Sequence, residues 1–581
     1  MELLVSGVLL ATYLAVRLAR NQKPDLVPVP TAQPVVRPGR TVSFDFPLFT
    51  PVRGAHRTTQ EAAHAHMMAQ PGPMFDLAGL CFPAREYLNR LFFITGKPSS
   101  GKTTLCRMML ASLGNLFPVL DAQAQAGLYP GDGKMRWMVT DPTNAFLPLL
   151  YRVVPPDVSI VRMSPHDADG VAWDIAKDVT NEVMNEALQR GLFPDSAKGG
   201  GDPFWMFKGR EVSRAPVSVF LHRSSDWGIR DFAVPFKYPQ FLKPLLMQCP
   251  RTRGMVKHDL VGRLGRDIVA TSSATINQLA TAAALWSKAK RKYSLRTFLD
   301  ERAVVHFAFT PAMAASLAGV ANAMTYVLIL LALERNDEFN HTLLIGDEAR
   351  YLHEITGMED LVARGRGAGL GAILLAQGIA GLNSTWGEKR VKELLDLVNT
   401  WICLRSGPET AEEFSKHVGV VEGIQKSYSY SSTYGQSVTR GTTYGGSTSS
   451  SFSGSSSSSN WSESHSVTSS SSHTNSESFA LHTKQAILPS ELTNLPLASP
   501  LDDLVRGFVF GPDVGAFEFA TPFMKALDSY PPAPFTQMSV RPDSDQVLKP
   551  WTLEDLRRLK LDPTSAFHKA LLATWGSKGG I

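Results

Sequence analysis

The eight residues Gly96–Thr103 constrain the fold of this chain more than any other segment. Their sequence, G-K-P-S-S-G-K-T, matches the pattern G-x-x-x-x-G-K-[ST] of loops that bind phosphate groups. An apolar run, Leu91–Thr95, precedes the loop, and a helical pattern follows it from Thr103 onward. Glycines let the backbone wrap around phosphate oxygens, and the N–H groups at the start of the helix face the anion. The segment therefore predicts a strand, a phosphate-binding loop and a helix, in that order.

Each residue of this loop is a candidate contact for ATP. We expect the Lys102 ammonium to reach the β- and γ-phosphates and the Thr103 hydroxyl to bind Mg²⁺. A chance turn rich in glycine and serine is the alternative, and the strand and helix on either side argue against it. The full set of candidates is Gly96, Lys97, Pro98, Ser99, Ser100, Gly101, Lys102, Thr103 and Thr104.

A second motif, Leu343–Glu348 with the sequence L-L-I-G-D-E, places two carboxylates after an apolar run. Ligands of α/β sheets bind at the carboxyl ends of the strands. Asp347 would hold Mg²⁺ through water, and Glu348 would orient or polarise the attacking water. Gly346 stands where an aliphatic residue is usual. Taken alone, the motif would be interpreted as two surface carboxylates, but beside the phosphate-binding loop the catalytic roles are favoured.

Three further polar residues lie close to the next predicted strand. Gln377 ends the apolar run Gly371–Ala376, at a position that faces the γ-phosphate in many such ATPases; the capping of a loop explains it equally well. Arg364 and Arg366 lie just before the same run. An arginine on such a loop can complete the site of a neighbouring subunit, and two solvated loop arginines are the simpler interpretation without further support.

The alternation of strand and helix patterns indicates an α/β fold. Several predicted strands are apolar on both faces, as strands covered by helices on both sides must be. The apolar run Met313–Leu333 is long enough to cross a bilayer, but it lies between the two halves of the predicted site, so we expect a buried helix. The predicted strands are Leu91–Thr95, Met135–Thr140, Val158–Met163, Ala303–Thr310, Thr342–Gly346, Gly371–Ala376, Thr400–Leu404 and Phe508–Phe510.

Two segments break this alternation. Residues 179–300 show helical patterns and polar loops, which predict a separate helical subdomain. Residues 427–478 are rich in Ser, Thr, Gly, Tyr and Asn and cannot bury a core of their own, so they fit either a flexible surface insert or a β-ribbon. The helical segment carries two basic clusters, one of Arg251, Arg253, Lys257, His258, Arg263 and Arg266, the other of Lys288, Lys290, Arg291, Lys292 and Arg296. Charge runs are usually solvated helix faces, so these clusters alone do not establish nucleic-acid binding.

The composition sets wider limits. A chain of 581 residues is too long for one hydrophobic core and suggests two or more domains. A net charge of +5 permits a nucleic-acid partner without requiring one. The four cysteines are scattered without a C-x-x-C pair, which disfavours a disulfide framework or a zinc site and fits a reducing compartment.

The N-terminus has the pattern of a membrane anchor. Leu3–Leu18 is almost entirely apolar, and Arg17, Arg20 and Lys23 form its basic flank, whereas only Glu2 precedes it. A cleaved signal peptide would carry its positive charge before the apolar run. We therefore expect one membrane helix within residues 1–20 and the bulk of the chain in the cytoplasm, with an ordinary buried helix as the alternative.

In their order along the chain, these motifs resemble the coupling-protein ATPases of type IV secretion and conjugation. The resemblance covers roughly residues 91–523. It departs from the family at Gly346, at Thr143, where Lys is usual, and in a single N-terminal membrane helix where two are common. The matching segments are Asp141-Pro142-Thr143, Ala172-Trp173-Asp174, Asp202-Pro203-Phe204-Trp205, Gly365-Arg366 through Gln377, Pro408-Glu409-Thr410-Ala411 and Leu488-Pro489-Ser490-Glu491-Leu492.

The resemblance implies a RecA-like nucleotide-binding domain, an all-α domain inserted within it and a hexameric ring. It implies ATP and Mg²⁺ as cofactors and makes Arg366 the preferred arginine finger, with Arg364 second. DNA, relaxase and relaxosome proteins, secretion-channel components and the bacterial inner membrane are the implied partners. The all-α domain would face the DNA–relaxase complex.

The sequence and the resemblance together give a domain division. A Pro-rich stretch, Tyr530–Pro542, leads to a terminal helix, Leu553–Lys560, whose start carries the capping pair Thr552 and Asp555. The predicted parts are a transmembrane anchor (1–20), a linker (21–80), the nucleotide-binding domain (81–178, 301–426 and 486–529), the all-α insertion (179–300), the Ser-rich insert (427–485) and the C-terminal tail (530–581).

Three functions fit these observations. A DNA-translocating ATPase that delivers the relaxosome is the first, with a chromosome-segregation translocase as its neighbour. A coupling receptor for secreted protein effectors is the second. A membrane scaffold that binds nucleotide without turnover is the third, and the intact set Lys102, Thr103, Asp347 and Glu348 argues against it.

Overall fold

The computed structural model describes most of the chain after residue 48. The predicted anchor, residues 1–20, and the linker up to residue 48 lie outside the described residues. The described ranges are 49–55, 57–142, 144–193, 203–309, 313–351, 356–451, 454–499, 501, 503–511, 513–523, 539–562 and 564–575. They fall into two compact units: residues 424–481 with 49–51, and the remainder.

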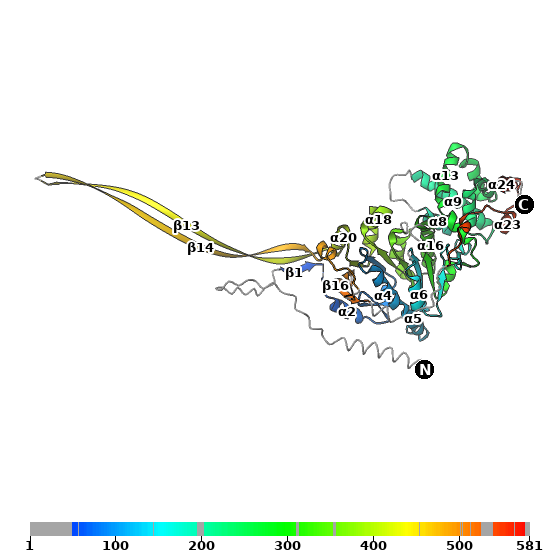
Figure 1. Cartoon of the computed structure of the whole chain (residues 1–581), viewed down its shortest axis with the longest axis horizontal. Coiled ribbons are helices and arrows are strands. Elements are labelled where there is room, and N and C mark those ends of the chain that lie inside the picture. The colour runs from blue at the N-terminus through cyan, green and yellow to red at the C-terminus, as the bar shows by residue number, and fades with distance from the viewer. Residues whose placement is uncertain are drawn as a thin grey trace. The chain divides into compact units, whose positions relative to one another are not determined.

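The larger unit is built around a nine-stranded sheet (Figure 1). Seven neighbouring strands run parallel, and β15 and β16 continue the sheet antiparallel at one edge. In spatial order the strands are β16 (Gly515–Pro522), β15 (Leu504–Gly511), β12 (Thr400–Leu404), β4 (Leu91–Thr95), β11 (Leu370–Ala376), β10 (Thr342–Gly346), β5 (Arg136–Asp141), β9 (Ala303–Ala308) and β6 (Ser159–Arg162). All eight strands predicted from the sequence are present, and β16 was not predicted.

Helices cover both faces of this sheet, which explains why its six inner strands are buried at every residue. Alternate residues of β4 enter opposite cores: Phe92 and Ile94 pack with α4 and α5, whereas Phe93 lies in the core that contains α16. The first face is covered by α2 (Gln60–Met68), α4 (Lys102–Gly114), α5 (Leu116–Gln125) and α6 (Leu147–Val153); the second by α8 (Glu182–Leu192), α16 (Ala314–Arg335), α17 (Met358–Arg364), α18 (Ile379–Trp386), α19 (Glu388–Leu397) and α20 (Pro408–Val418).

Helix α16 corresponds to the predicted buried run Met313–Leu333. Its residues 316–335 are apolar and long enough to cross a membrane, yet 78% of the most apolar window is buried inside the protein. It packs beneath the sheet and contacts α8. The structure therefore has a core helix where length alone would allow a membrane span.

The described residues between the short paired strands β7 (Ala172–Trp173) and β8 (Lys292–Tyr293) are helices and loops. Their core is continuous with the α16 face of the sheet. The helices not yet named are α7 (Ile175–Asp178), α9 (Pro203–Arg223), α10 (Ile229–Lys237), α11 (Leu242–Leu246), α12 (Pro250–His258), α13 (Gly262–Gln278) and α14 (Ala280–Trp286); α15 (Leu295–Asp300) follows β8.

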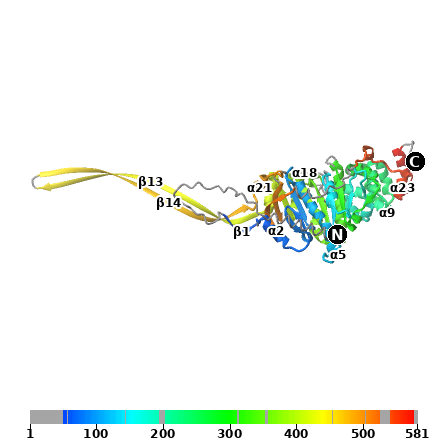
Figure 2. The ribbon, with the colours of Figure 1, turned by 60° about the horizontal axis from the view of Figure 1, so that its bottom comes forward.

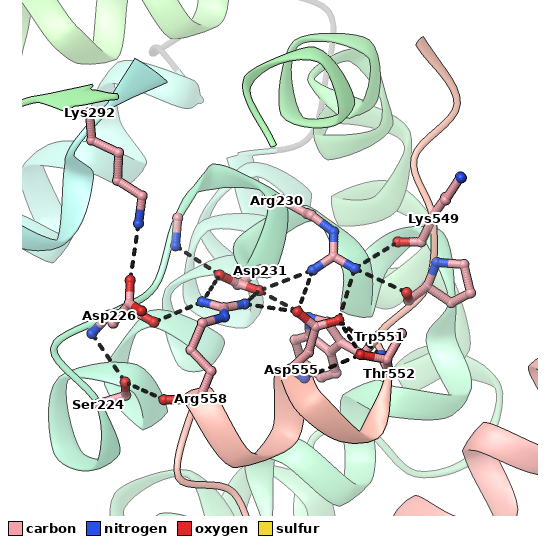
Figure 3. A network of polar contacts seen from close by, with 12 residues as sticks. Ser224, Asp226, Arg230, Asp231, Lys292, Lys549, Trp551, Thr552, Asp555 and Arg558 are labelled. Carbon is pink, nitrogen blue, oxygen red and sulfur yellow. Dashed lines mark hydrogen bonds and ion pairs between the residues drawn. The ribbon is translucent and has the colours of Figure 1, made fainter. Parts of the chain in front are cut away.

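Residues 539–562, which we call the C-terminal clasp, pack against these helices (Figure 3). Trp551 is fully buried between the rings of Phe220 and Phe241 and donates a hydrogen bond to Asp231. The clasp also reaches the loop after β6, where the Arg541 N–H donates to the His166 carbonyl at 2.9 Å. The clasp therefore connects the helices between β7 and β8 with a loop of the sheet.

Partly buried ion pairs hold helix α23 (Leu553–Arg558) of the clasp in place. Arg558 lies 2.7 Å from Asp231 and 3.1 Å from Asp555, and Arg230 lies 2.8 Å from Asp555 (Figure 3). Burial alone would raise the pKa of Asp555, but the hydrogen bond and charge of Arg230 outweigh it and hold that pKa below its ordinary value. The predicted capping box of Thr552 and Asp555 is present. The helix ends at Arg558, two residues earlier than predicted, and α24 (Ser565–Trp575) follows it.

The Ser-rich segment forms a two-stranded ribbon. Strand β13 (Val420–Ser451) pairs with β14 (Gly454–Gln485), and β1 (Phe49–Gly54) pairs with the other edge of β13 (Figure 2). The sequence left a flexible insert and a β-ribbon open, and the structure has the ribbon. The remaining elements are the hairpin β2 (Met74–Leu77) and β3 (Leu80–Pro83), α3 (Ala84–Tyr87) and α21 (Pro489–Thr493).

We expect Trp551→Ala to lower the free energy of unfolding by about 3–5 kcal/mol, because it leaves a large cavity between two aromatic rings. Chemical denaturation followed by tryptophan fluorescence and circular dichroism measures this loss. Lys549→Ala is the matched control, since its side chain is exposed and only its carbonyl binds Arg230. Equal stability of the two variants would contradict a structural role for the clasp.

Candidate functional site

The loop Gly96–Thr103 connects β4 to α4, as the sequence predicted. Two backbone hydrogen bonds tie its start to neighbouring strands: the Gly96 N–H donates to Ala376 at 3.2 Å and the Lys97 N–H to Arg405 at 2.8 Å. Gly101 has a φ of +93°, and a Cβ there would lie 2.9 Å from a Val505 methyl group. Glycine is therefore required at this position for the loop to close.

The loop brings Lys102 to the residues of the second motif. The Lys102 Nζ lies 3.1 Å from the Glu348 Oε2, and the Gln377 Nε2 donates to the same oxygen at 3.2 Å. The Lys102 and Glu348 side chains are each only 9% exposed. Three predicted site residues, far apart in sequence, thus meet in one cluster, in which Gln377 is half-buried.

Strand order explains this meeting. Strand β11 lies between β4 and β10, and all three run parallel, so their carboxyl ends share one edge of the sheet. Asp347 and Glu348 follow β10 directly, and Gln377 follows β11. Glu348 has a φ of +54°, which costs a non-glycine residue about 1–3 kcal/mol and places its carboxylate over the loop.

Asp347 is buried beside the first turns of α4. Its N–H donates to the Thr140 carbonyl at 3.0 Å, which fixes it against β5. Burial raises the pKa of the Cys106 thiol well above its ordinary value, and the nearby Asp347 and Asp141 carboxylates raise it further. Cys106 therefore stays a neutral thiol, and two carboxylates approach the helix that begins at Lys102.

The donor atoms near α4 suit Mg²⁺. A hydroxyl at Thr103 and a carboxylate at Asp347 are the hard oxygen ligands this ion prefers, and it commonly takes its remaining ligands from water and phosphate. Within the described part of the chain, no group of three or more His, Cys, Asp or Glu residues could hold a metal ion by itself. The arrangement fits an ion shared with a nucleotide and does not fit an all-protein metal site.

Asp141, at the end of β5, is a buried carboxylate whose partners the sequence did not predict. It accepts hydrogen bonds from the Ala145 and Phe146 N–H groups at 3.0 and 2.8 Å and lies 3.1 Å from the His306 Nε2. Burial alone would raise its pKa, but the bond to His306 and the backbone donors outweigh burial and lower it. The Asp-Pro turn is therefore held by an ionised carboxylate at the site's edge.

Arg350 is a site residue that sequence reasoning missed. Its Nε lies 3.5 Å from the Glu348 Oε1, on the side of the carboxylate away from Lys102. It follows Glu348 by two residues in the short helix Ala349–Tyr351. The pattern D-E-A-R could have drawn attention to it, because an arginine two residues after a glutamate can reach that carboxylate easily.

The structure does not bring Arg364 or Arg366 to this cluster. Arg366 precedes β11, whereas Gln377 follows it, so this seven-residue strand separates them by roughly 20 Å. Its side chain is 68% exposed and lies 3.6 Å from Glu86; that of Arg364 is 64% exposed and pairs with Asp360. Any catalytic role of either arginine must therefore concern another copy of the chain.

The strand order and the glycine-bordered loop at the carboxyl end of β4 define a P-loop nucleotide-binding fold. Residues 74–510 match the family model described as the type IV secretion-system coupling protein DNA-binding domain. Because the match extends over well more than half of its length, the chain belongs to the type IV secretion-system coupling proteins.

Solved structures agree with this fold. The bacterial conjugative coupling protein TrwBdeltaN70 superposes with a TM-score of 0.59 at 15% identity, over 86% of this chain and 97% of that chain. The plasmid coupling protein TrwB in complex with ADP and Mg²⁺ has a TM-score of 0.59 at 14% identity, over 85% and 97%. Its complex with a non-hydrolysable ATP analogue, ADPNP, gives 0.59 at 14%, over 86% and 98%. No curated protein sequence matches the chain.

We expect Asp141→Asn to cost about 3 kcal/mol at pH 7, because the amide N–H₂ replaces one of the two accepting oxygens and then faces a backbone N–H donor. A lowered carboxylate pKa stabilises the fold above its ordinary value of about 3.9, and that stability is lost as the pH falls through the lower folded pKa. The difference between wild type and variant should therefore shrink below about pH 4 in denaturant titrations. Asp169→Asn, at an exposed carboxylate, should cost less than about 0.5 kcal/mol.

Proposed function

We propose that this protein is a membrane-anchored, ring-forming ATPase that couples ATP hydrolysis to delivery of DNA into a type IV secretion channel. The observation that carries the proposal is the cluster of Lys102, Glu348 and Gln377 beside the phosphate-binding loop. This cluster supports nucleotide chemistry at these residues, and family membership supports the transport role.

ATP with Mg²⁺ is the proposed ligand of the loop, and TrwB structures with ADP and Mg²⁺ or with ADPNP support this choice. Lys102 would leave Glu348 for the β- and γ-phosphate oxygens, with Thr103 and Asp347 holding Mg²⁺ directly and through water. Bound Mg²⁺ would neutralise charge that develops on the phosphates. Glu348, released from Lys102, would then orient the attacking water, with Gln377 and Arg350 fixing its two oxygens.

The exposed position of Arg366 supports a site completed between subunits. Its guanidinium lies at the amino end of β11, across the sheet from the site of its own chain. In a ring, which we propose to be a hexamer, this edge of one subunit would face the phosphate-binding loop of the next. Arg366 would act there as an arginine finger, with Arg364 as the second candidate.

The helices between β7 and β8, which we propose form an all-α domain, are the proposed contact for DNA. The first basic cluster is exposed throughout on α12 and α13; the second is exposed at four of its five positions around β8, with Arg296 partly buried. Exposed cations that contact phosphates give binding largely independent of sequence and strongly dependent on salt. The relaxase and relaxosome proteins, and components of the channel, are the further proposed partners of this face.

Residues 1–20 are the proposed single membrane helix, which would place the protein in the bacterial inner membrane with its bulk in the cytoplasm. This segment lies outside the described residues, and its apolar run and basic flank support the proposal.

The central experiment measures hydrolysis of the detergent-solubilised protein with and without DNA. We expect DNA to stimulate turnover, Lys102→Ala to abolish it, and Glu348→Gln to retain bound ATP while turnover falls at least about 100-fold. Lys389→Ala, at a side chain 87% exposed on α19, is the control for loss of a lysine.

Turnover independent of DNA in an assembled ring would contradict the DNA-transport proposal. Capture of secreted proteins without a relaxase, under the same conditions, would assign the ring to protein cargo.

We expect Arg366→Ala to lower turnover by about 10³-fold or more, because it removes a charge that stabilises the transition state. Mixing Arg366→Ala chains with Lys102→Ala chains should restore part of the activity. In such a mixture, the phosphate-binding loop of an Arg366→Ala chain, with its intact Lys102, can lie next to the intact Arg366 of a Lys102→Ala chain. Arg364→Ala is the matched control, and mixtures that stay inactive would exclude a role for Arg366 between subunits.

A further inference from the structure

The ribbon of β13 and β14 is far longer than the fold needs. Each strand has 32 residues, which corresponds to about 100 Å at 3.3 Å per residue. Isolated two-stranded hairpins are marginally stable in water, and three or more strands are usually needed. Strand β1 has only six residues and pairs with the outer edge of β13. Among the described residues, most of that edge and all of the outer edge of β14 have no strand partner.

These long edges lack the features that normally prevent pairing with another chain. Natural edge strands carry lysines, prolines or bulges that block further strands. Residues 427–478 contain no lysine and no proline, and their charged residues are Arg440, Glu463 and Glu477. Because the segment has so few charges, copies of it repel one another little. Because it has no proline, every one of its residues keeps a backbone N–H donor.

The register of the hairpin shows that the two faces of the ribbon differ in their residue types. Ser427 lies opposite Ser478, at an Oγ–Oγ distance of 2.6 Å, and Ser451 precedes Gly454 across the connection, so opposite residues have numbers that add to 905. Even positions of β13 then share a face with odd positions of β14, because successive strand residues alternate between faces.

One of these faces consists, from residue 429 to 478, only of Ser, Thr, Gly and Asn. The other face holds the positions of every charged, aromatic, histidine, valine and glutamine residue of the two strands in that range, among them Tyr444 and Trp461, which are opposite each other. A strict division over this length is typical of strands in the wall of a tube, where one face meets a lumen and the other the surroundings.

We propose that the ribbons of neighbouring copies pair edge to edge, β14 of one copy against β13 of the next, to form a closed antiparallel β-tube. The partner is a second copy because the two free edges are complementary: β13 and β14 run in opposite directions, so the same contact repeats around a rotation axis and closes. The inference rests on the ring of the proposed function, and it assigns the Ser-rich segment to assembly of that ring.

Cross-linking between two differently tagged chains tests the contact. One full-length chain carries Ser449→Cys in β13 and the other Ser456→Cys in β14, positions that lie at the same distance from the tip of the ribbon in their own chains. Co-assembled chains treated with a short bis-maleimide should give the mixed dimer. The unsubstituted chain is the background control, since Cys81 is partly exposed, whereas Cys106, Cys249 and Cys403 are buried. Adding Thr442→Lys and Ser459→Lys should reduce the yield at least five-fold, whereas Thr442→Gln and Ser459→Gln should not.

Sedimentation of the same samples separates this inference from the proposed ring. A chain in which Asn-Gly joins Ser427 to Ser478 should need at least ten-fold more protein for half-assembly. The ribbon contact would be overturned if the shortened chain formed the ring equally well and the full chain gave no cross-links. That result would leave the proposed ATPase ring intact. Absence of any oligomer in either chain would overturn the ring and the tube together. Open filaments in place of closed particles would exclude closure.

Discussion

The parallel pairing of β4, β11 and β10 is the constraint on which the site depends. Because β11 lies between the other two, Gln377 is placed between the phosphate-binding loop and the two carboxylates. The strand order therefore brings the Lys102 and Glu348 side chains close enough to form an ion pair. The ion pair between them is buried, and a buried pair is favourable only when its geometry and hydrogen bonds are good. Gln377 and Arg350 supply the additional contacts to the Glu348 carboxylate.

Local sequence was sufficient to predict most strands of the sheet and the phosphate-binding loop. Most of the predicted strands are short runs buried on both faces, which their apolar composition indicates. The spacing of the glycines, lysine and threonine in Gly96–Thr103 is specific to phosphate-binding loops. The helical segment also followed from its broken alternation. The hydroxyl-rich ribbon could only be left between two alternatives, because its strands bury no core that would make one conformation evident.

Long-range partners could not be predicted. Nothing near Asp141 in sequence points to His306, and nothing near Asp231 points to Arg558, since these contacts exist only after the chain has folded. Arg350 is different, because its partner Glu348 lies only two residues earlier and the local sequence already brings the two close. The placement of Arg366 across the sheet followed from strand direction, but its function depends on a second copy of the chain.

The C-terminal clasp has a consequence for synthesis. Trp551 fills a space lined by Phe220 and Phe241 and binds Asp231, which lies 320 residues earlier in the chain. At elongation rates of 5–20 residues per second, roughly 15–60 s pass between the synthesis of Asp231 and that of Trp551, which completes the core of those helices. During that interval they expose aromatic surface that the finished protein hides. Folding of these helices is therefore completed only after 320 further residues have been synthesised.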